Sequence, residues 1–385
     1  MGNKSSKTNE IQFPELFDPN YQPPCGSALG QQFDHTVEPN LFQYDLLKSL
    51  GRGAFGKVMV VRSKRDGKLY ALKYISKSQC VKQKAVRNIL SERRILERVD
   101  HPFVCNLQCA FQDDEHMYLL LDLMLGGDLR FHLDRIGHFT EEAVRFHISE
   151  ISSGLNYLHK HNIIHRDIKP DNVLLDQWGH CHLTDFNSSG RIRSGKPCKS
   201  VIGTHSYMAP EMIQKRGYNQ SVDWWSLGVL MFECLYGKLP FRGRTNQKTN
   251  EAIISGQIMF PKKCPQEISL ECYAAVLGFL QCDIQKRLGC GENKIRNHPF
   301  LDSIDWDALE AKQIQPPFKP EIKLIASDTL TQLEEVLFEE PPLTHKSSKR
   351  SLKLPKPGSP MDVIRSEFKV FNREVYIDPR DSTPL

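Results

Sequence analysis

Residues 165–172 read His-Arg-Asp-Ile-Lys-Pro-Asp-Asn, and they are the most informative block of the sequence. This block places the carboxylate of Asp167 and the ammonium of Lys169 close in sequence to the side-chain amide of Asn172. Two short motifs follow along the chain, Asp-Phe-Asn at 185–187 and Ala-Pro-Glu at 209–211. Carboxylates that orient a nucleophile or hold a metal, together with a fixed cation, suit a reaction in which negative charge develops on the substrate.

A glycine-rich segment, Gly51-Arg52-Gly53-Ala54-Phe55-Gly56, precedes this block and matches the pattern G-x-G-x-x-G. The pattern alone also fits dinucleotide-binding folds, in which a helix follows the glycines directly. Here β-branched residues at 58–61, a turn signal at 65–67 and an alternating run at 69–75 predict a β-hairpin instead. We interpret the loop as a flap over phosphate groups, because glycines let backbone amides approach phosphate oxygens closely.

Lys73 and Glu92 form a candidate ion pair. A single lysine on a strand is usually an exposed charge, but Glu92 shares one face of a predicted helix with apolar residues, namely Ala85, Ile89, Ile95, Leu96 and Val99. A carboxylate on an apolar face requires a cation, and Lys73 is the natural candidate. Such a pair would hold the ammonium where it can meet nucleotide phosphates. The alternative is a surface helix whose Glu92 only borders the core.

In this order, the motifs resemble the signature set of eukaryotic protein kinases, and the resemblance covers roughly Tyr44 to Phe300. It implies a bilobal α+β fold, with a small antiparallel β-sheet lobe carrying one main helix and a larger, mostly helical lobe. It also implies that Asp167 accepts the substrate hydroxyl proton, that Lys169 neutralises charge on the phosphoryl group, and that Asn172 and Asp185 hold two Mg²⁺ ions. Lys169 stands two residues after Asp167, and a lysine at this position is similar to the pattern of serine/threonine kinases rather than that of tyrosine kinases.

The resemblance further implies an ATP site and a catalytic set of Asp167, Lys169, Lys73 and Glu92. Leu121 would be the gatekeeper, Asp122 and Met124 would contact adenine, and Asp128 would lie near the ribose. The expected cofactor-binding residues are Gly51, Arg52, Gly53, Ala54, Phe55, Gly56, Val58, Ala71, Lys73, Leu121, Asp122, Met124 and Asp128.

Three acids, Asp128, Asp171 and Glu233, match positions at which basophilic relatives hold substrate arginines. The resemblance therefore implies a preference for basic protein substrates. The alternative is that these acids have structural roles, since acids at helix N-termini and in solvated clefts are common.

Further segments narrow the resemblance to the AGC group of kinases and, within it, to the YANK branch. The segments are 125–130, 222–228, 304–308 and 368–372. Glu211 and Arg287 are also similar to this group and are expected to form a buried ion pair. Asn187 stands where glycine is usual, and asparagine tolerates left-handed backbone angles well. We expect an active kinase in which Asn187 disfavours the inactive flip of its segment; the alternative is a catalytically weak nucleotide-binding scaffold.

The segment between residues 185 and 211 carries an expected regulatory site. Ser200 matches the activation-loop phosphosite of AGC kinases, and Arg166 is a ready partner for a phosphate there. Thr204 is expected to orient Asp167 and Lys169. The alternative for the loop serines is simple contact with solvent.

The aromatic residues Phe368 and Phe371 are expected to fill a groove on the small lobe beside the helix that carries Glu92. Because Asn372 cannot be phosphorylated, such docking would be constitutive. Alternatively, the two aromatic side chains form a satellite hydrophobic cluster without regulatory meaning.

We expect four parts along the chain: an irregular N-terminal arm at 1–40, the small lobe at 41–121, the large lobe at 122–300 and an AGC-like C-terminal tail at 301–385. The periodicity predicts strands over Tyr44–Leu50, Lys57–Arg62, Lys68–Ile75 and Met117–Leu121. It predicts helices over Lys82–Val99, after an N-cap at Thr140, and over Val222–Tyr236, the last apolar nearly all round.

The composition of the 385 residues is that of a globular protein. There are 51 Lys plus Arg against 46 Asp plus Glu, and this mild, dispersed excess argues against a nucleic-acid partner. The 11 cysteines are scattered and no apolar run is long enough to span a bilayer, which predicts a cytoplasmic protein. The first residues fit N-myristoylation at Gly2, which would allow reversible membrane association. We expect a monomer that acts on protein substrates with Ser or Thr acceptors.

Overall fold

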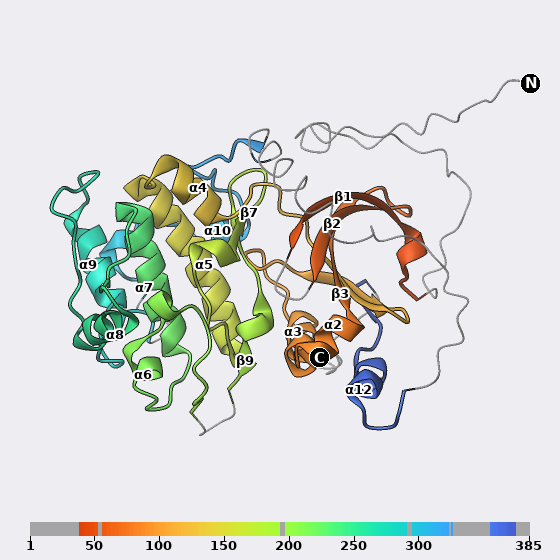
Figure 1. The fold of residues 1–385 in the computed structure, drawn as a ribbon. Helices are drawn as coiled ribbons and strands as arrows, with labels where there is room; N and C mark the ends of the chain where they lie inside the picture. The colour runs from red at the N-terminus through yellow and green to blue at the C-terminus, as the bar shows by residue number, and fades with distance from the viewer. Residues whose placement is uncertain are drawn as a thin grey trace, which may run out of the picture.

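The structure is a computed structural model that describes residues 38–52, 56–192, 197–290, 295–322, 325 and 355–374. Figure 1 shows a sheet-containing lobe beside a helical lobe. The chain passes from the first lobe to the second after residue 121. This is the bilobal α+β arrangement that the sequence predicts.

The small lobe is built on a six-stranded sheet with the order β1-β2-β3-β5-β4-β10, in which neighbouring strands are antiparallel. β1 and β2 pair out to Arg52 opposite Lys57, so the glycine-rich segment closes a hairpin, as predicted. β4 and the edge strand β10 were not predicted from the sequence. The strands are β1 (Tyr44–Arg52), β2 (Lys57–Ser63), β3 (Leu69–Ser76), β4 (Leu107–Gln112), β5 (His116–Leu121) and β10 (Phe371–Asn372).

The helical region of the small lobe differs from the prediction of one helix over Lys82–Val99. The structure has two helices, α2 (Lys77–Lys82) and α3 (Val86–Leu96). Lys84 separates them, because its φ of 56° is left-handed and interrupts helical geometry. The apolar face of α3 still packs in the core, so the predicted amphipathic pattern is correct although its start is not.

The large lobe contains most of the helices (Figure 1). Its main helices are α4 (Leu129–Ile136), α5 (Glu141–Lys160), α6 (Pro210–Ile213), α7 (Ser221–Tyr236), α8 (Asn246–Ser255), α9 (Leu270–Phe279) and α10 (Trp306–Glu310). Short strands flank the catalytic segment, namely β6 (Ile163–Ile164), β7 (Val173–Leu175), β8 (Cys181–Leu183) and β9 (Gly190–Arg191). Single turns of 3-10 helix are η1 (Leu41–Gln43), η2 (Pro170–Asn172), η3 (Phe186–Ser188), η4 (His205–Tyr207) and η5 (Pro299–Leu301).

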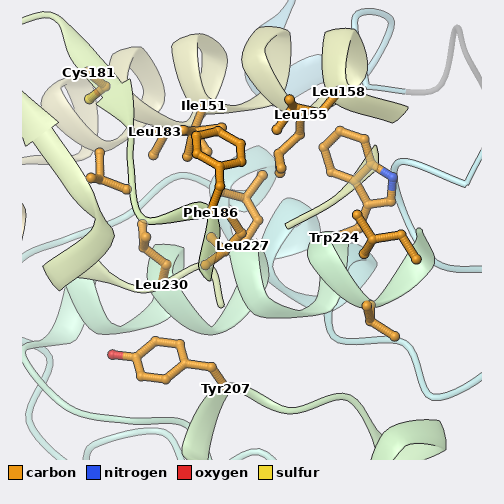
Figure 2. Packing of buried hydrophobic residues seen from close by; sticks show 14 of the residues in the cluster. Ile151, Leu155, Leu158, Cys181, Leu183, Phe186, Tyr207, Trp224, Leu227 and Leu230 are labelled. Atoms are coloured by element: carbon orange, nitrogen blue, oxygen red, sulfur yellow. The ribbon is translucent and has the colours of Figure 1, made fainter. Parts of the chain in front are cut away.

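The predictions for α5 and α7 are confirmed. The Thr140 side chain accepts a hydrogen bond from Ala143 N and caps α5. Every residue of α7 is buried, as expected for a helix through the middle of the lobe. Figure 2 shows Ile151 and Leu155 of α5 in the same apolar core as side chains of α7, which include Leu227 and Leu230. No helix among the residues that the structure describes is long and apolar enough to cross a membrane.

Glu211 and Arg287 form the predicted buried ion pair. Arg287 Nη1 lies 2.7 Å from Glu211 Oε1, and Arg287 Nη2 lies 3.1 Å from Oε2. The guanidinium also donates to Ser221 O at 3.1 Å and to Gln281 O at 2.9 Å, so most of its donors are satisfied. The pair ties α6 to the segment that follows α9, and Arg287 also contacts the start of α7 through Ser221 O. Removing one partner would leave a buried charge uncompensated, which costs about 3–5 kcal/mol.

The C-terminal segment 355–374 returns to the small lobe. It forms α12 (Pro360–Glu367) and then β10, which pairs with β4. Phe368 is fully buried and Phe371 nearly so, in the same core cluster as the apolar face of α3. The predicted docking of the two aromatic side chains beside α3 is therefore present.

Candidate active site

Lys73 on β3 and Glu92 on α3 meet in the interior of the small lobe. Lys73 Nζ donates to Glu92 Oε1 at 2.7 Å, and Glu92 is only 2% exposed. The predicted pair is thus present, and the alternative of a surface helix is wrong. Burial alone would lower the pKa of Lys73, but the carboxylates of Glu92 and Asp185 outweigh it and raise that pKa, so the ammonium stays charged.

Asp167 is the centre of a hydrogen-bonded cluster. Its Oδ1 accepts from Thr204 N at 2.8 Å and from Thr204 Oγ1 at 2.7 Å. Its Oδ2 accepts from Asn172 Nδ2 at 3.0 Å and lies 3.2 Å from Lys169 Nζ. Lys169 also donates to Thr204 Oγ1 at 2.9 Å, so Thr204 contacts both residues, as predicted.

The environment of Asp167 favours its ionised form. Burial tends to raise the pKa of this carboxyl group, but hydrogen bonds from Thr204 and the charge of Lys169 outweigh burial and lower the pKa below its ordinary value. The carboxylate is therefore charged at neutral pH and oriented by fixed donors.

The loop that carries Asp167 is held by Asp223, a fully buried acid on α7. Asp223 accepts from His165 N at 2.9 Å, from Arg166 N at 2.8 Å and from His159 Nε2 at 2.8 Å. The His165 ring contacts Thr184 O at 2.9 Å, so this histidine has a structural role in the loop. Asp223 was not among the site residues predicted from the sequence. Asp223 and Glu233 are the two carboxylates of this largely apolar helix, and a carboxylate in such a helix was the signal that could have identified Asp223.

The backbone at 185–187 differs from the prediction of a left-handed residue at 187. The left-handed residue is Asp185, with φ of 63°, whereas Asn187 lies within η3 and has no positive φ. A residue other than glycine is tolerated at 187 because the helical turn makes no left-handed demand there. The backbone and side-chain N–H groups of Asn187 both donate to Asp185 Oδ1. The expected effect of Asn187 on the inactive flip stays a prediction.

The strand residues predicted for the nucleotide site lie on one face of the sheet. Val58 on β2 is opposite Lys73, and Ala71 on β3 is opposite Leu121 at the end of β5. Gly56 has no room for a side chain, since a Cβ there would lie 2.1 Å from the backbone oxygen of Tyr74. Gly51 and Arg52 end β1. The residues predicted between them and Gly56, namely Gly53, Ala54 and Phe55, lie outside the described residues.

The carboxylates of Asp122 and Asp128 are engaged within the protein. Asp122 accepts from Asn106 N at 3.1 Å and from Gln108 Nε2 at 2.6 Å. Asp128 is the N-cap of α4, and burial raises the pKa of this carboxyl. Met124 is partly buried between them in the connection of the lobes. Any contact of Asp122 with adenine would therefore have to use its backbone.

Arg166 contacts Ser200, the predicted phosphosite. Its Nη1 donates to Ser200 Oγ at 3.1 Å and to Tyr218 OH at 3.4 Å. No carboxylate lies within ion-pair distance of Arg166 in the part of the chain that the structure describes, so the guanidinium is available to a phosphate. Phosphorylation of Ser200 stays a prediction.

The two lobes, the Lys73–Glu92 pair in the small lobe and the Asp167 cluster in the large lobe together define a protein kinase. In agreement, the sequence model for the protein kinase domain matches residues 44–301, and the chain belongs to this family.

Curated relatives make the assignment more specific. The chain is 38% identical over 363 residues to serine/threonine-protein kinase 32B of Homo sapiens, covering 89% of this chain and 86% of that protein. It is 37% identical over 371 residues to serine/threonine-protein kinase 32C of Mus musculus, covering 91% and 75%. It is 39% identical over 319 residues to serine/threonine-protein kinase Sgk1 of Fundulus heteroclitus, covering 81% and 73%. The chain is a serine/threonine protein kinase of the YANK branch of the AGC group, and none of these findings favours the pseudokinase alternative.

Proposed function

We propose that this kinase uses ATP with Mg²⁺ and that Asp167 is the residue that receives the proton of the Ser or Thr hydroxyl of a protein substrate. The observation that carries the proposal is the cluster in which Thr204, Asn172 and Lys169 all contact the Asp167 carboxylate. A carboxylate with its pKa held low accepts a hydrogen bond from the hydroxyl and orients the oxygen for attack.

Lys73 and Lys169 supply the fixed positive charges of the proposed mechanism. Lys73, held by Glu92, would contact phosphate oxygens of ATP, and Lys169 would offset charge on the transferred phosphoryl group. The nucleotide would lie against the sheet face formed by Val58, Ala71 and Leu121 and beneath the glycine-rich loop. The backbones of Asp122 and Met124 would meet adenine, and Asp128 would lie near the ribose.

The donor atoms of Asp185 and Asn172 fit Mg²⁺, which prefers oxygen ligands and retains water and phosphate oxygens. Asn172 Nδ2 donates to the backbone oxygen of Asp167 at 2.8 Å, which leaves its amide oxygen available as a ligand. Asp185 is held by Asn187 through one carboxylate oxygen. When bound, the metal would neutralise phosphate charge, while the chain's own residues orient the hydroxyl and the nucleotide.

Replacing Asp167 with asparagine tests the proposal. Purified wild-type protein should autophosphorylate with Mg²⁺ and ATP, and Asp167→Asn should reduce the rate about 10²–10⁴-fold, because the amide cannot accept the proton. The control is Asp114→Asn, an exposed acid in the turn between β4 and β5. Equal rates for the wild type and a folded Asp167→Asn protein would refute the assigned role.

Replacing Thr204 tests how the Asp167 carboxylate is kept ionised. The pKa of Asp167 is lowered, so the enzyme should lose activity only as the pH falls through that low pKa. In Thr204→Val one donor to Asp167 is missing, its pKa rises, and the acidic limb of the kcat/KM profile moves to higher pH. Thr204→Ser keeps the hydroxyl and should keep the profile. An unchanged limb in Thr204→Val would contradict this explanation.

We further propose a cytoplasmic monomer that associates reversibly with membranes through an acylated Gly2, a residue outside the described part of the chain. The support is the N-terminal sequence pattern, and a single myristoyl chain gives only marginal binding. Protein made in eukaryotic cells should sediment with anionic vesicles, whereas Gly2→Ala protein should not. Equal sedimentation of both would exclude the acyl anchor.

A further inference from the structure

Arg130 on α4 is a cation that the proposed catalytic cluster does not use. Its Nη1 lies 3.0 Å from Glu233 Oε1, and its Nη2 donates to Glu233 Oε2 at 3.0 Å. Nη2 also donates to Tyr207 OH at 3.0 Å, and Nε lies 3.6 Å from Asp171 Oδ2. One guanidinium therefore connects α4 to α7, to η2 of the catalytic loop and to η4.

The acids of this cluster depend on Arg130 for charge compensation. The Glu233 side chain is 8% exposed, and it also accepts a hydrogen bond from Tyr207. Across the described ranges, Arg130 is the only cation within ion-pair distance of Glu233 or of Asp171. Without Arg130 the cluster would be an anionic pocket with a buried carboxylate, a site that strongly attracts a cation.

The cluster lies beside the path of a substrate peptide. Asp171 precedes Asn172, which donates to Asp167, and Tyr207 closely follows Thr204, which also donates to Asp167. An extended peptide advances about 3.3–3.6 Å per residue, so residues a few positions from the acceptor hydroxyl can reach side chains that neighbour the Asp167 contacts. The Asp171 side chain is 48% exposed, which shows that the cluster opens to solvent.

We propose that Arg130 determines substrate specificity by occupying this anionic subsite from within the chain. The kinase then does not select arginine beside the acceptor residue, and it accepts protein segments without basic residues there. This inference rests on the proposed function, because it assumes that Asp167 receives the acceptor hydroxyl. It differs from the preference for basic substrates that the sequence resemblance implies, since Glu233 and Asp171 are already paired.

The experiment compares peptides that differ only in arginine or alanine at the positions flanking the acceptor serine. For the wild-type full chain, the ratio of kcat/KM between arginine and alanine peptides should stay within about threefold at each position. In Arg130→Ala the best arginine peptide should gain at least about tenfold over its alanine counterpart, because its guanidinium replaces the missing one.

Two further variants control this comparison. Arg135 is on the same helix, and its guanidinium lies over the Phe131 ring, 5.5 Å from the ring centroid. Arg135→Ala should therefore keep the wild-type ratio of kcat/KM between arginine and alanine peptides. Arg130→Ala combined with Glu233→Gln removes both charges, so it leaves no buried carboxylate unpaired and should lose the arginine preference again.

A wild-type preference for arginine of tenfold or more would overturn the inference, whether or not Arg130→Ala folds. So would an unchanged ratio in a folded Arg130→Ala protein. Absence of transfer to every peptide by the wild type would instead overturn the proposed function, and this inference with it.

Discussion

The buried ion pair of Lys73 and Glu92 is the interaction on which the rest of this structure depends. Removing two charges from water costs several kcal/mol per ion, and only direct contact in good geometry repays it. The 2.7 Å contact requires α3 to pack firmly against β3, so the pair fixes the helix and orients the ammonium together. Because the charge of Asp185 also acts on Lys73, this pair couples the small lobe to the proposed metal-binding segment of the large lobe.

The C-terminal segment holds the same helix from its other side. Arg93, next to Glu92, lies over the Phe368 ring at 5.2 Å from its centroid and donates to Lys369 O. Arg373 donates to Val99 O at 2.7 Å and to Leu107 O at 2.6 Å, beyond the end of α3. Tail docking and the position of Glu92 are thus linked through one short helix. No phosphate is needed for this, since Asn372 pairs with Cys109 as part of the sheet.

The features that could be predicted from the sequence follow from strong local rules. A carboxylate on the apolar face of α3 required a cation as its partner. The threonine followed by two acids at the start of α5 indicated the N-terminus of a helix. The Glu211 pair with Arg287 was instead implied by the resemblance to AGC kinases, and the structure contains it. The strands β4 and β10 were not predicted, because strand formation at these positions depends on packing against neighbouring strands more than on the residues' own pattern.

What the sequence did not reveal depends on backbone angles and on distant contacts. Asn187 was assigned the left-handed conformation that Asp185 in fact adopts, and the break at Lys84 has no marker residue such as glycine or proline. The role of Arg130 could not be predicted from its local sequence, because its partners Glu233 and Tyr207 come from segments far along the chain. Asp223 was seen only as part of a motif, although it anchors the catalytic loop.

The most direct test of the account is steady-state kinetics of Glu92→Gln with ATP as the varied substrate. Because the neutral amide cannot hold the buried ammonium in place, kcat/KM should fall at least about tenfold, equivalent to about 1.4 kcal/mol. The exposed Glu115→Gln should behave like the wild type, and thermal unfolding should show that both variants are folded. A folded Glu92→Gln enzyme with wild-type kcat/KM would contradict the central role of the Lys73 pair.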